Sequence, residues 1–387
     1  MNHRKYLVFV SACLGMLLFG VSLITLGSIA TELRARYSLD AIAAGTLFSI
    51  LPFGILAGSF VFGPVIDRWG YKLILAFGCI GMFAGFQGIA FAGSLDMLRI
   101  SIFVFGFGSG IINGATNALV ADISDERRGA NLSILGVFFG LGALGMPLVL
   151  GAVAGHLESF HVLSAVGWVT LAVGVLYLLI QMPPAKRAAD SGGARLSALI
   201  KPLLLLIAFF LFWQSALEAV INNWTTTYVT TRGLMSEANA LYALSLHVSG
   251  MVVMRLLVGS VLSLVPQTLI MWICLGFLTI GVAVMQIASS MPLATVGLIL
   301  SGAGLAGGFP VMLGFVGERF ASLSGTAFSF VFVVALIGNM LINYLMGIVV
   351  HNFGIAHLTT ACYIGTAIMA IVYFFIIRRL GPAKEIG

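Results

Sequence analysis

Charged residues are scarce in this sequence. Only 8% of the 387 residues are Asp, Glu, Lys or Arg, whereas 60% are hydrophobic. A soluble domain of this size needs a largely polar, charged surface, so the composition excludes the ordinary soluble classes. The apolar runs exceed the length of about 18 residues that a membrane-spanning helix requires. The sequence therefore predicts an all-α integral membrane protein.

Cysteines are also few, and they are isolated. The four cysteines, at positions 13, 79, 274 and 362, fall in four separate apolar runs. They show neither CxxC nor Cys/His spacing, which argues against disulfides and metal ligation. No Ser/His/Asp or Cys/His arrangement converges elsewhere in the chain. We therefore expect no metal, no cofactor and no enzymatic activity.

Eleven polar or Pro/Gly-rich breaks divide the chain into twelve expected spans. The longest break, residues 183–201, is rich in Pro, Gly, Ser and charge, which predicts a flexible cytoplasmic linker. The first apolar run is too long for the core of a signal peptide and is kept as a span. The predicted domains are an N-terminal six-helix bundle at 1–182 and a C-terminal six-helix bundle at 202–387.

The basic residues indicate the orientation. With both termini on one side of the membrane, 14 of the 19 Lys and Arg residues fall on that side and four on the other. Arg255 lies within a span. This bias follows the positive-inside rule, so we expect both termini in the cytoplasm. It also explains the net charge of +6 without a nucleic-acid partner. The short loops favour a bacterial inner membrane.

The two halves share a glycine pattern. When the chain is shifted by 196 residues, eight glycines fall on glycines, including Gly54 on Gly250 and Gly106 on Gly302. Glycine allows membrane helices to approach closely. A repeat of six spans is typical of transporters, whose solute site lies between the halves near the middle of the membrane.

A signature motif follows the second span. The stretch "GPVIDRWGYK" resembles the loop between spans 2 and 3 of the major facilitator superfamily, although Tyr71 stands where a basic residue is usual. The resemblance covers essentially the whole chain and implies the major facilitator fold with a cytoplasmic gate. Acid–base pairs at the cytoplasmic ends of spans suit such a gate. The expected gate residues are Gly63, Asp67, Arg68, Gly70, Lys72, Asp122, Arg127, Glu318 and Arg319.

One acid lies in the middle of a span. Twelve of the thirteen acids fall in loops, termini or span ends, and the remaining one is Glu218. A charge at this depth is costly and usually marks a transport pathway. His247 and Arg255, in the next span, fall at a similar depth and are candidate partners for ion coupling. Burial favours the neutral carboxyl and a nearby cation favours the carboxylate, so Glu218 suits proton coupling.

Polar side chains recur at helical spacing on four expected spans, and three of these spans line the cavity in the resembled fold. Amides offer donors and acceptors to hydroxyl groups, which favours a sugar. Trp224 either stacks on a sugar or lies at the membrane interface. The candidate solute-binding residues are Gln214, Glu218, Asn222, Asn223, Trp224, Asn113, Asn117, Asn339, Asn343, Ser22 and Thr25.

The segment "ALEAVINNWTTTYV" resembles span 7 of the fucose permease-like branch, the fucose–galactose–glucose:proton symporters, through Glu218, Trp224 and Tyr228. That branch uses an acid in span 1 and another in span 4. Here span 1 has no acid, and the span 4 position is Asn113 or a neighbour. Three alternatives follow: Glu218 couples protons alone, it binds sodium with Asn222, or the protein is a uniporter.

The sequence thus predicts a monomeric secondary transporter. It moves a small polar solute, a sugar or sugar-like molecule, by alternating access, with proton or sodium coupling through Glu218. A proton-linked exporter of amphipathic drugs is the alternative within the class. A membrane receptor that keeps the fold without transport is the alternative outside it.

Overall fold

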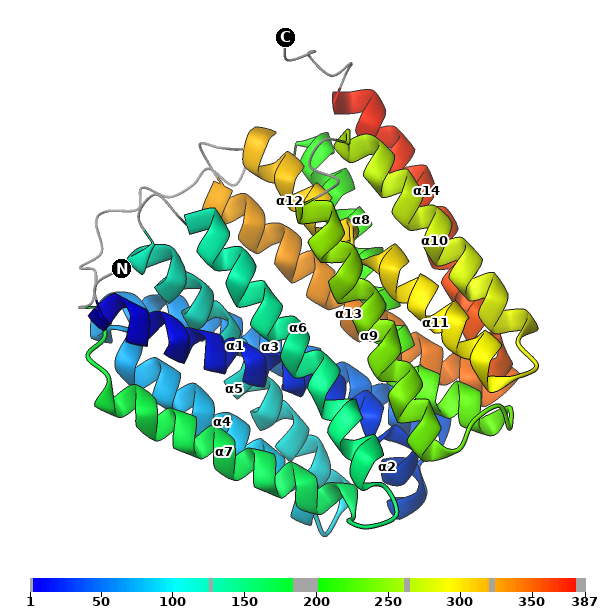
Figure 1. The fold of residues 1–387 in the computed structure, drawn as a ribbon, viewed down its shortest axis with the longest axis horizontal. Helices are drawn as coiled ribbons and strands as arrows, with labels where there is room; N and C mark the ends of the chain where they lie inside the picture. The colour runs from blue at the N-terminus through cyan, green and yellow to red at the C-terminus, as the bar shows by residue number, and fades with distance from the viewer. Residues whose placement is uncertain (1–2, 125–127, 184–200, 261–264, 320–323, 381–387) are drawn as a thin grey trace. The chain divides into compact units, whose positions relative to one another are not determined.

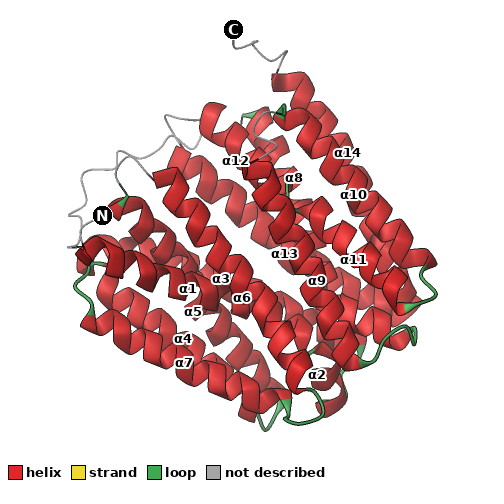
Figure 2. Cartoon of the chain, in the orientation of Figure 1, coloured by secondary structure: helices red, strands yellow, loops and turns green. Residues whose placement is uncertain are grey.

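The structure is a computed structural model that describes residues 3–124, 128–183, 201–260, 265–319 and 324–380. All regular elements in these residues are helices, with no strand among them (Figure 2). Twelve helical stretches in the described chain are long and apolar enough to cross a membrane, the first at Lys5–Ser28 and the last at Ile355–Leu380. The predicted all-α architecture with twelve spans is therefore confirmed.

The first of two compact units comprises Met1–Asp190 together with Ser236–Ser245. Within it, α5 packs against α1, α3 and α4, while α6 packs on α1 and α7 on α4. Its helices, blue to green in Figure 1, are α1 (His3–Ser28), α2 (Ala30–Arg36), α3 (Ala41–Trp69), α4 (Tyr71–Phe91), α5 (Leu95–Ile123), α6 (Arg128–Val153) and α7 (Ser159–Leu179).

The second unit comprises Ser191–Met235 and Leu246–Gly387. Here α8 packs against α13 and α14, and α10 packs against α11 and α14. Its helices are α8 (Pro202–Thr231), the later part of α9 (Glu237–Ser260), α10 (Gln267–Ile287), α11 (Met291–Leu305), α12 (Gly308–Arg319), α13 (Ser324–Phe353), the short 3-10 helix η4 (Ile355–His357) and α14 (Leu358–Leu380).

The predicted linker at 183–201 lies almost entirely outside the described residues, so the domain boundaries stay a prediction. The early part of α9, up to Ser245, groups with the first unit although its later part belongs to the second.

Local sequence signals set the helix ends. Asp40 precedes α3, and its carboxylate accepts a hydrogen bond from the Ala43 amide at 2.7 Å. Ser94 caps α5 in the same way through the Met97 amide. Gly70 of the signature motif lies between α3 and α4 with φ of 79°, a conformation that only glycine adopts without strain. The motif glycine therefore makes the sharp turn between two spans.

The glycine repeat corresponds to repeated helix contacts. In the first unit, a Cβ on Gly54 of α3 would collide with the carbonyl oxygen of Phe103 on α5. In the second unit, a Cβ on Gly250 of α9 would collide with the carbonyl oxygen of Ile299 on α11. Both the glycines and the carbonyls that they approach are 196 residues apart. The two helix pairs are therefore equivalent.

The reverse contacts obey the same offset. Gly106 of α5 lies against the Leu51 carbonyl of α3, and Gly302 of α11 lies against the His247 carbonyl of α9. Each helix pair is thus joined by two glycines that face each other's backbone. The sequence repeat therefore records a repeated packing geometry within each unit, as small residues at helix interfaces predict.

Gly302→Ala is expected to destabilise the protein by roughly 1–3 kcal/mol, because the added methyl group forces α9 and α11 apart. Gly276→Ala is the matched control, since the space around Gly276 of α10 is open. That control should be neutral or slightly stabilising because alanine favours helix. Thermal unfolding of both variants in detergent checks this. Equal melting temperatures would contradict a close contact at Gly302.

Candidate functional site

The intramembrane acid of α8 lies opposite a cation. The Glu218 carboxylate is 3.9 Å from a terminal nitrogen of Arg255 on α9, and their side chains are 17% and 27% exposed. This distance allows electrostatic attraction but is too long for a direct hydrogen bond. The ion pair is therefore loose. Protonation of Glu218, or a water or solute hydroxyl group placed between the two side chains, is enough to break or bridge the contact. Arg255, one of the two predicted partners, is thus close to Glu218.

Gln214, one helical turn before Glu218, meets a break in a neighbouring span. Its amide nitrogen donates to the carbonyl oxygen of Leu305 at 2.8 Å, and its side chain is buried. Leu305 is the last residue of α11, and α12 begins at Gly308, so the tenth span is interrupted there. Gln214 therefore satisfies a carbonyl that the break releases. Interrupted helices are typical of solute and ion sites in transporters.

Sequence reasoning missed this break. This span carries no polar stripe comparable to those of the other spans, and none of the predicted solute-binding residues comes from it. The signal was present in the Gly-Gly-Phe-Pro run at 307–310. Two glycines before a proline disfavour a continuous helix even inside an apolar span.

Asn222, one turn after Glu218, has unmet hydrogen-bonding capacity. Its amide oxygen is buried and makes no hydrogen bond within the described part of the chain. The same holds for the hydroxyl of Thr225, which is fully buried on the same helix. Buried polar atoms normally have partners, so these two acceptors indicate where a ligand or water would bind. The α8 stripe therefore combines one satisfied amide, one ion pair and two atoms that need a partner.

A second amide group joins α8 to α13. The Asn223 amide donates to Asn343 at 3.2 Å, and Asn343 donates to the Asn339 carbonyl at 2.8 Å. Asn343 is fully buried and Asn223 nearly so, whereas Asn339 is partly exposed. These three predicted residues therefore come together, and they hold two helices in register.

Trp224 and Tyr228 are enclosed by protein. Trp224 is 0% and Tyr228 is 1% exposed. The Tyr228 hydroxyl accepts a hydrogen bond from Arg232 at 2.6 Å and donates one to the Met285 carbonyl at 3.3 Å. In this structure neither ring offers a face to a solute. Both residues pack the second unit.

His247 faces another helix. Its Nδ1 lies 2.9 Å from the Leu298 carbonyl oxygen and 3.2 Å from the Ser301 hydroxyl, both on α11. The ring is fully buried. A carbonyl partner requires a proton on Nδ1, and Nε2 makes no hydrogen bond within the described residues. The contacts of His247 thus tie it to α11, while Arg255 is the cation beside Glu218.

The predicted polar residues of the first unit satisfy themselves locally. Ser22 and Thr25 donate to carbonyl oxygens of their own helix, those of Phe19 and Val21. Asn117 donates to the carbonyl and side-chain oxygens of Asn113, at 2.9 and 3.1 Å. Both amides on α5 remain partly exposed. They are the polar groups of this set that stay available.

The motif loop is held by an unexpected partner. The hydroxyl of Tyr71, the residue that departs from the family pattern, donates to the carboxylate of Asp122 at the end of α5. Tyr71 thus supplies a donor where a basic residue is usual. In the second unit Arg319 donates to the Leu380 carbonyl at 2.8 Å. The side chains of Asp67, Arg68 and Glu318, and all of Arg127, lie outside the described residues.

No three His, Cys, Asp or Glu side chains in the described chain are grouped as a metal site.

A sequence model of the Major Facilitator Superfamily matches residues 8–341, so the chain belongs to this family. It is therefore a multi-pass membrane transporter and not an enzyme.

Similar proteins cover its full length. The mouse (Mus musculus) protein "Sodium-dependent glucose transporter 1A" is 22% identical over 95% of both chains. A crystal structure of a D-xylose–proton symporter has a TM-score of 0.80 at 17% identity, over 96% of this chain and 97% of that one. The nucleoside transporter NupG gives 0.78 at 16% identity, over 97% and 99% of the two chains.

Asn343→Ala is expected to lower stability by about 1 kcal/mol, because it leaves the Asn223 amide without its acceptor in a buried contact. Asn352→Ala, on the exposed end of the same helix, is the matched control. Thermal unfolding of the purified variants measures the difference. If both variants unfold at the wild-type temperature, the Asn223–Asn343 contact contributes nothing.

Proposed function

We propose that this transporter moves a neutral, polyhydroxylated solute, a sugar or sugar-like molecule, by alternating access, and that Glu218 couples this movement to a proton. The observation that carries the proposal is the loose Glu218–Arg255 pair beside the unpartnered Asn222 oxygen. The mouse relative is named as a sodium-dependent glucose transporter, and its similarity to this chain covers 95% of both proteins. This similarity supports a sugar as the solute.

The ion pair suits coupling because ionised and protonated Glu218 require different partners. A carboxylate inside a membrane is stable only with a compensating cation, which Arg255 supplies. A protonated Glu218 no longer holds Arg255, and it becomes a hydrogen-bond donor for a solute hydroxyl. Proton and solute would then bind together, which is the requirement for symport. Because the two groups are 3.9 Å apart, replacing Arg255 by a proton and a solute hydroxyl group at Glu218 breaks no direct hydrogen bond between them.

The solute chemistry follows from the neighbouring amides. The Asn222 oxygen accepts a hydrogen bond, and the partly exposed amide of Asn339, in the same unit, offers both a donor and an acceptor. This combination matches vicinal hydroxyl groups and offers little to a strongly anionic molecule. Arg255 is already engaged with Glu218, which further disfavours a multiply charged anion.

Sodium is the second candidate for the coupling ion, favoured by the name of the mouse relative. A sodium ion prefers carboxylate and amide oxygens, and Glu218 and Asn222 present these one helical turn apart. We further infer from the distribution of Lys and Arg that both termini lie in the cytoplasm. The short loops favour a bacterial plasma membrane. A monomer stays part of the proposal.

Proteoliposomes test the coupling. Wild-type protein should accumulate a labelled hexose or polyol against its gradient when the outside is acidified, whereas Glu218→Gln should only equilibrate it. Exchange of internal for external solute should survive in Glu218→Gln, because exchange does not require net proton transfer. Asp96→Asn, an exposed acid paired with Arg99, is the control and should behave as wild type.

The same assay separates the alternatives. Accumulation driven by a sodium gradient at constant pH would replace the proton with sodium. Equal uptake by wild type and Glu218→Gln, without dependence on either ion, would remove coupling from Glu218 and indicate a uniporter. Failure to move any sugar or polyol would overturn the solute class, and amphipathic cations would be the next panel.

A further inference from the structure

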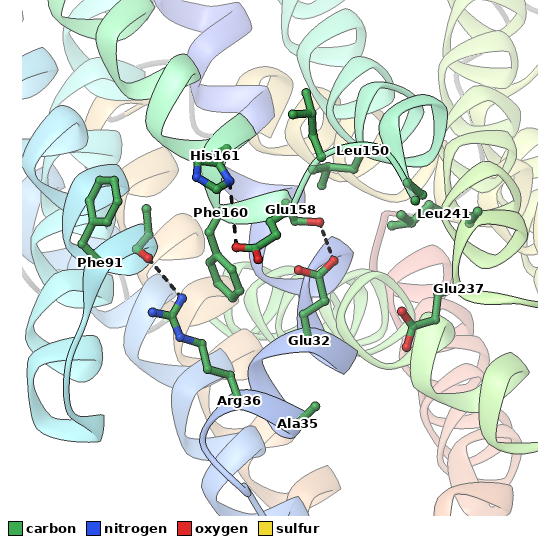
Figure 3. Close-up of a pocket in the computed structure, with 16 residues that line it drawn as sticks. Glu32, Ala35, Arg36, Phe91, Leu150, Glu158, Phe160, His161, Glu237 and Leu241 are labelled. Carbon is green, nitrogen blue, oxygen red and sulfur yellow. Dashed lines mark hydrogen bonds and ion pairs between the residues drawn. The ribbon is translucent and has the colours of Figure 1, made fainter.

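A second group of acids lies outside the membrane spans, in a cavity of the first unit. The cavity, about 700 Å³ in volume, lies at the ends of the spans away from the N-terminus. Glu32 of α2, Glu158 just before α7, and Glu237 at the start of α9 all line it (Figure 3). These acids come from three separate parts of the sequence. The fold therefore brings three carboxyl groups to one small space.

Glu32 is the most enclosed of the three. It is partly buried, whereas Glu158 and Glu237 are exposed. Its carboxylate accepts a hydrogen bond from the hydroxyl of Ser159, the buried first residue of α7. A hydroxyl brings no charge to compensate the carboxylate. Glu32 therefore faces two acids across the cavity and is held by a neutral partner.

The two basic residues that line the cavity have partners other than Glu32. Arg36, on the same helix as Glu32, donates to the Ala90 carbonyl at 3.1 Å and lies over the Phe160 ring at 4.4 Å (Figure 3). His161 lies 3.9 Å from Glu158, at an exposed position. These contacts leave Glu32 facing Glu158 and His161 from the start of α7, Glu237 from α9, and Arg36 from its own helix.

The pKa of Glu32 is raised above its ordinary value. Burial is the largest cause, and the nearby carboxylates of Glu237 and Glu158 raise it further, while the hydrogen bond from Ser159 lowers it. Part of this burial and all of the repulsion from Glu237 depend on the position of α9. When the start of α9 moves away, the pKa of Glu32 should therefore fall toward the ordinary value.

The start of α9 is docked on the first unit in this structure. Residues 236–245 group with that unit, whereas the rest of α9 does not. The Ser245 hydroxyl lies 3.4 Å from the Leu144 carbonyl oxygen of α6, and the Tyr242 ring lies against Gly151 of the same helix. The carboxyl groups of Glu32 and Glu237 line the same cavity beside these contacts, so repulsion between two carboxylates there opposes docking.

We propose that Glu32 is a proton-binding residue that controls the docking of the first turns of α9 on the first unit. A proton on Glu32 removes its repulsion from Glu237 and stabilises the docked arrangement. Because the docked arrangement holds this proton more tightly, docking becomes more favourable as the pH falls through the pKa of Glu32. As the pH rises, Glu32 ionises and the segment is released. The proton acts here as a regulator supplied from this face of the membrane.

The test measures a distance by electron paramagnetic resonance. Spin labels on His156→Cys and Ser236→Cys report docking, since both positions are exposed and neither lines the cavity. The four native cysteines are buried, so labelling favours the introduced ones. In otherwise wild-type protein, the ratio of docked to released molecules should rise as the pH falls from 8 to 5, by about fivefold, the lower end of ordinary coupling between two sites.

Three variants make the test specific. Glu32→Gln should remain docked at both pH values, because an amide keeps the hydrogen-bond acceptor and removes the charge. Glu237→Gln should weaken the pH dependence of docking and move its midpoint to lower pH, because one cause of the raised pKa of Glu32 is gone and burial alone remains to link the proton to docking. Asp96→Asn, an exposed acid outside the cavity, should leave the midpoint unchanged.

Ser159→Ala gives a further check, because loss of the hydrogen bond that lowers the pKa of Glu32 should move the midpoint to higher pH. A pH-independent distance in the wild-type background, or an unchanged transition in Glu32→Gln, would overturn the proposal. The distance is measured without solute, so this outcome is independent of the solute and of the role of Glu218.

Discussion

The close approach of helix backbones at glycine is the constraint on which this structure depends. Lipid is as apolar as the helix surfaces, so helices in a bilayer associate through packing and not through the hydrophobic effect. Gly54 and Gly106 join one helix pair, and Gly250 and Gly302 join its counterpart, each glycine lying against a carbonyl of the partner helix. The side chains between these helices are then fixed in depth and direction.

Such close packing leaves little room for water, so each polar group inside a span has to find a partner in the protein. Gln214 does so at the break in the tenth span, and Asn223 does so on α13. Glu218, Asn222 and Thr225, on one face of α8, are among the exceptions. The pair between Glu218 and Arg255 is loose, and the Asn222 oxygen has no partner among the described residues. Unmet hydrogen-bonding capacity, more than polarity itself, therefore distinguishes a solute site from helix packing.

This distinction sets the limit of what the sequence could predict. Composition predicts the spans, and depth along the helices brings Arg255 near Glu218. The direction of a side chain around its helix depends on packing between helices. For this reason the sequence could not decide whether His247 packs or pairs with Glu218, and it did not predict that Trp224 is buried. The break between Leu305 and Gly308 was hidden because hydropathy treats Met291–Val316 as one continuous span. The acidic cavity joins segments far apart in the sequence, which no local pattern shows.

The two acids argued to bind protons differ in what a proton there can do. Glu218 lies inside a span, where a bound proton could be released to the opposite side and drive accumulation of a solute. Glu32 lies outside the spans, so its proton returns to the side from which it came. By linkage, such a proton changes the population of conformations and the rate of transport, but it performs no work on the solute. The accumulation ratio would therefore depend on Glu218, and the pH range of rapid transport on Glu32.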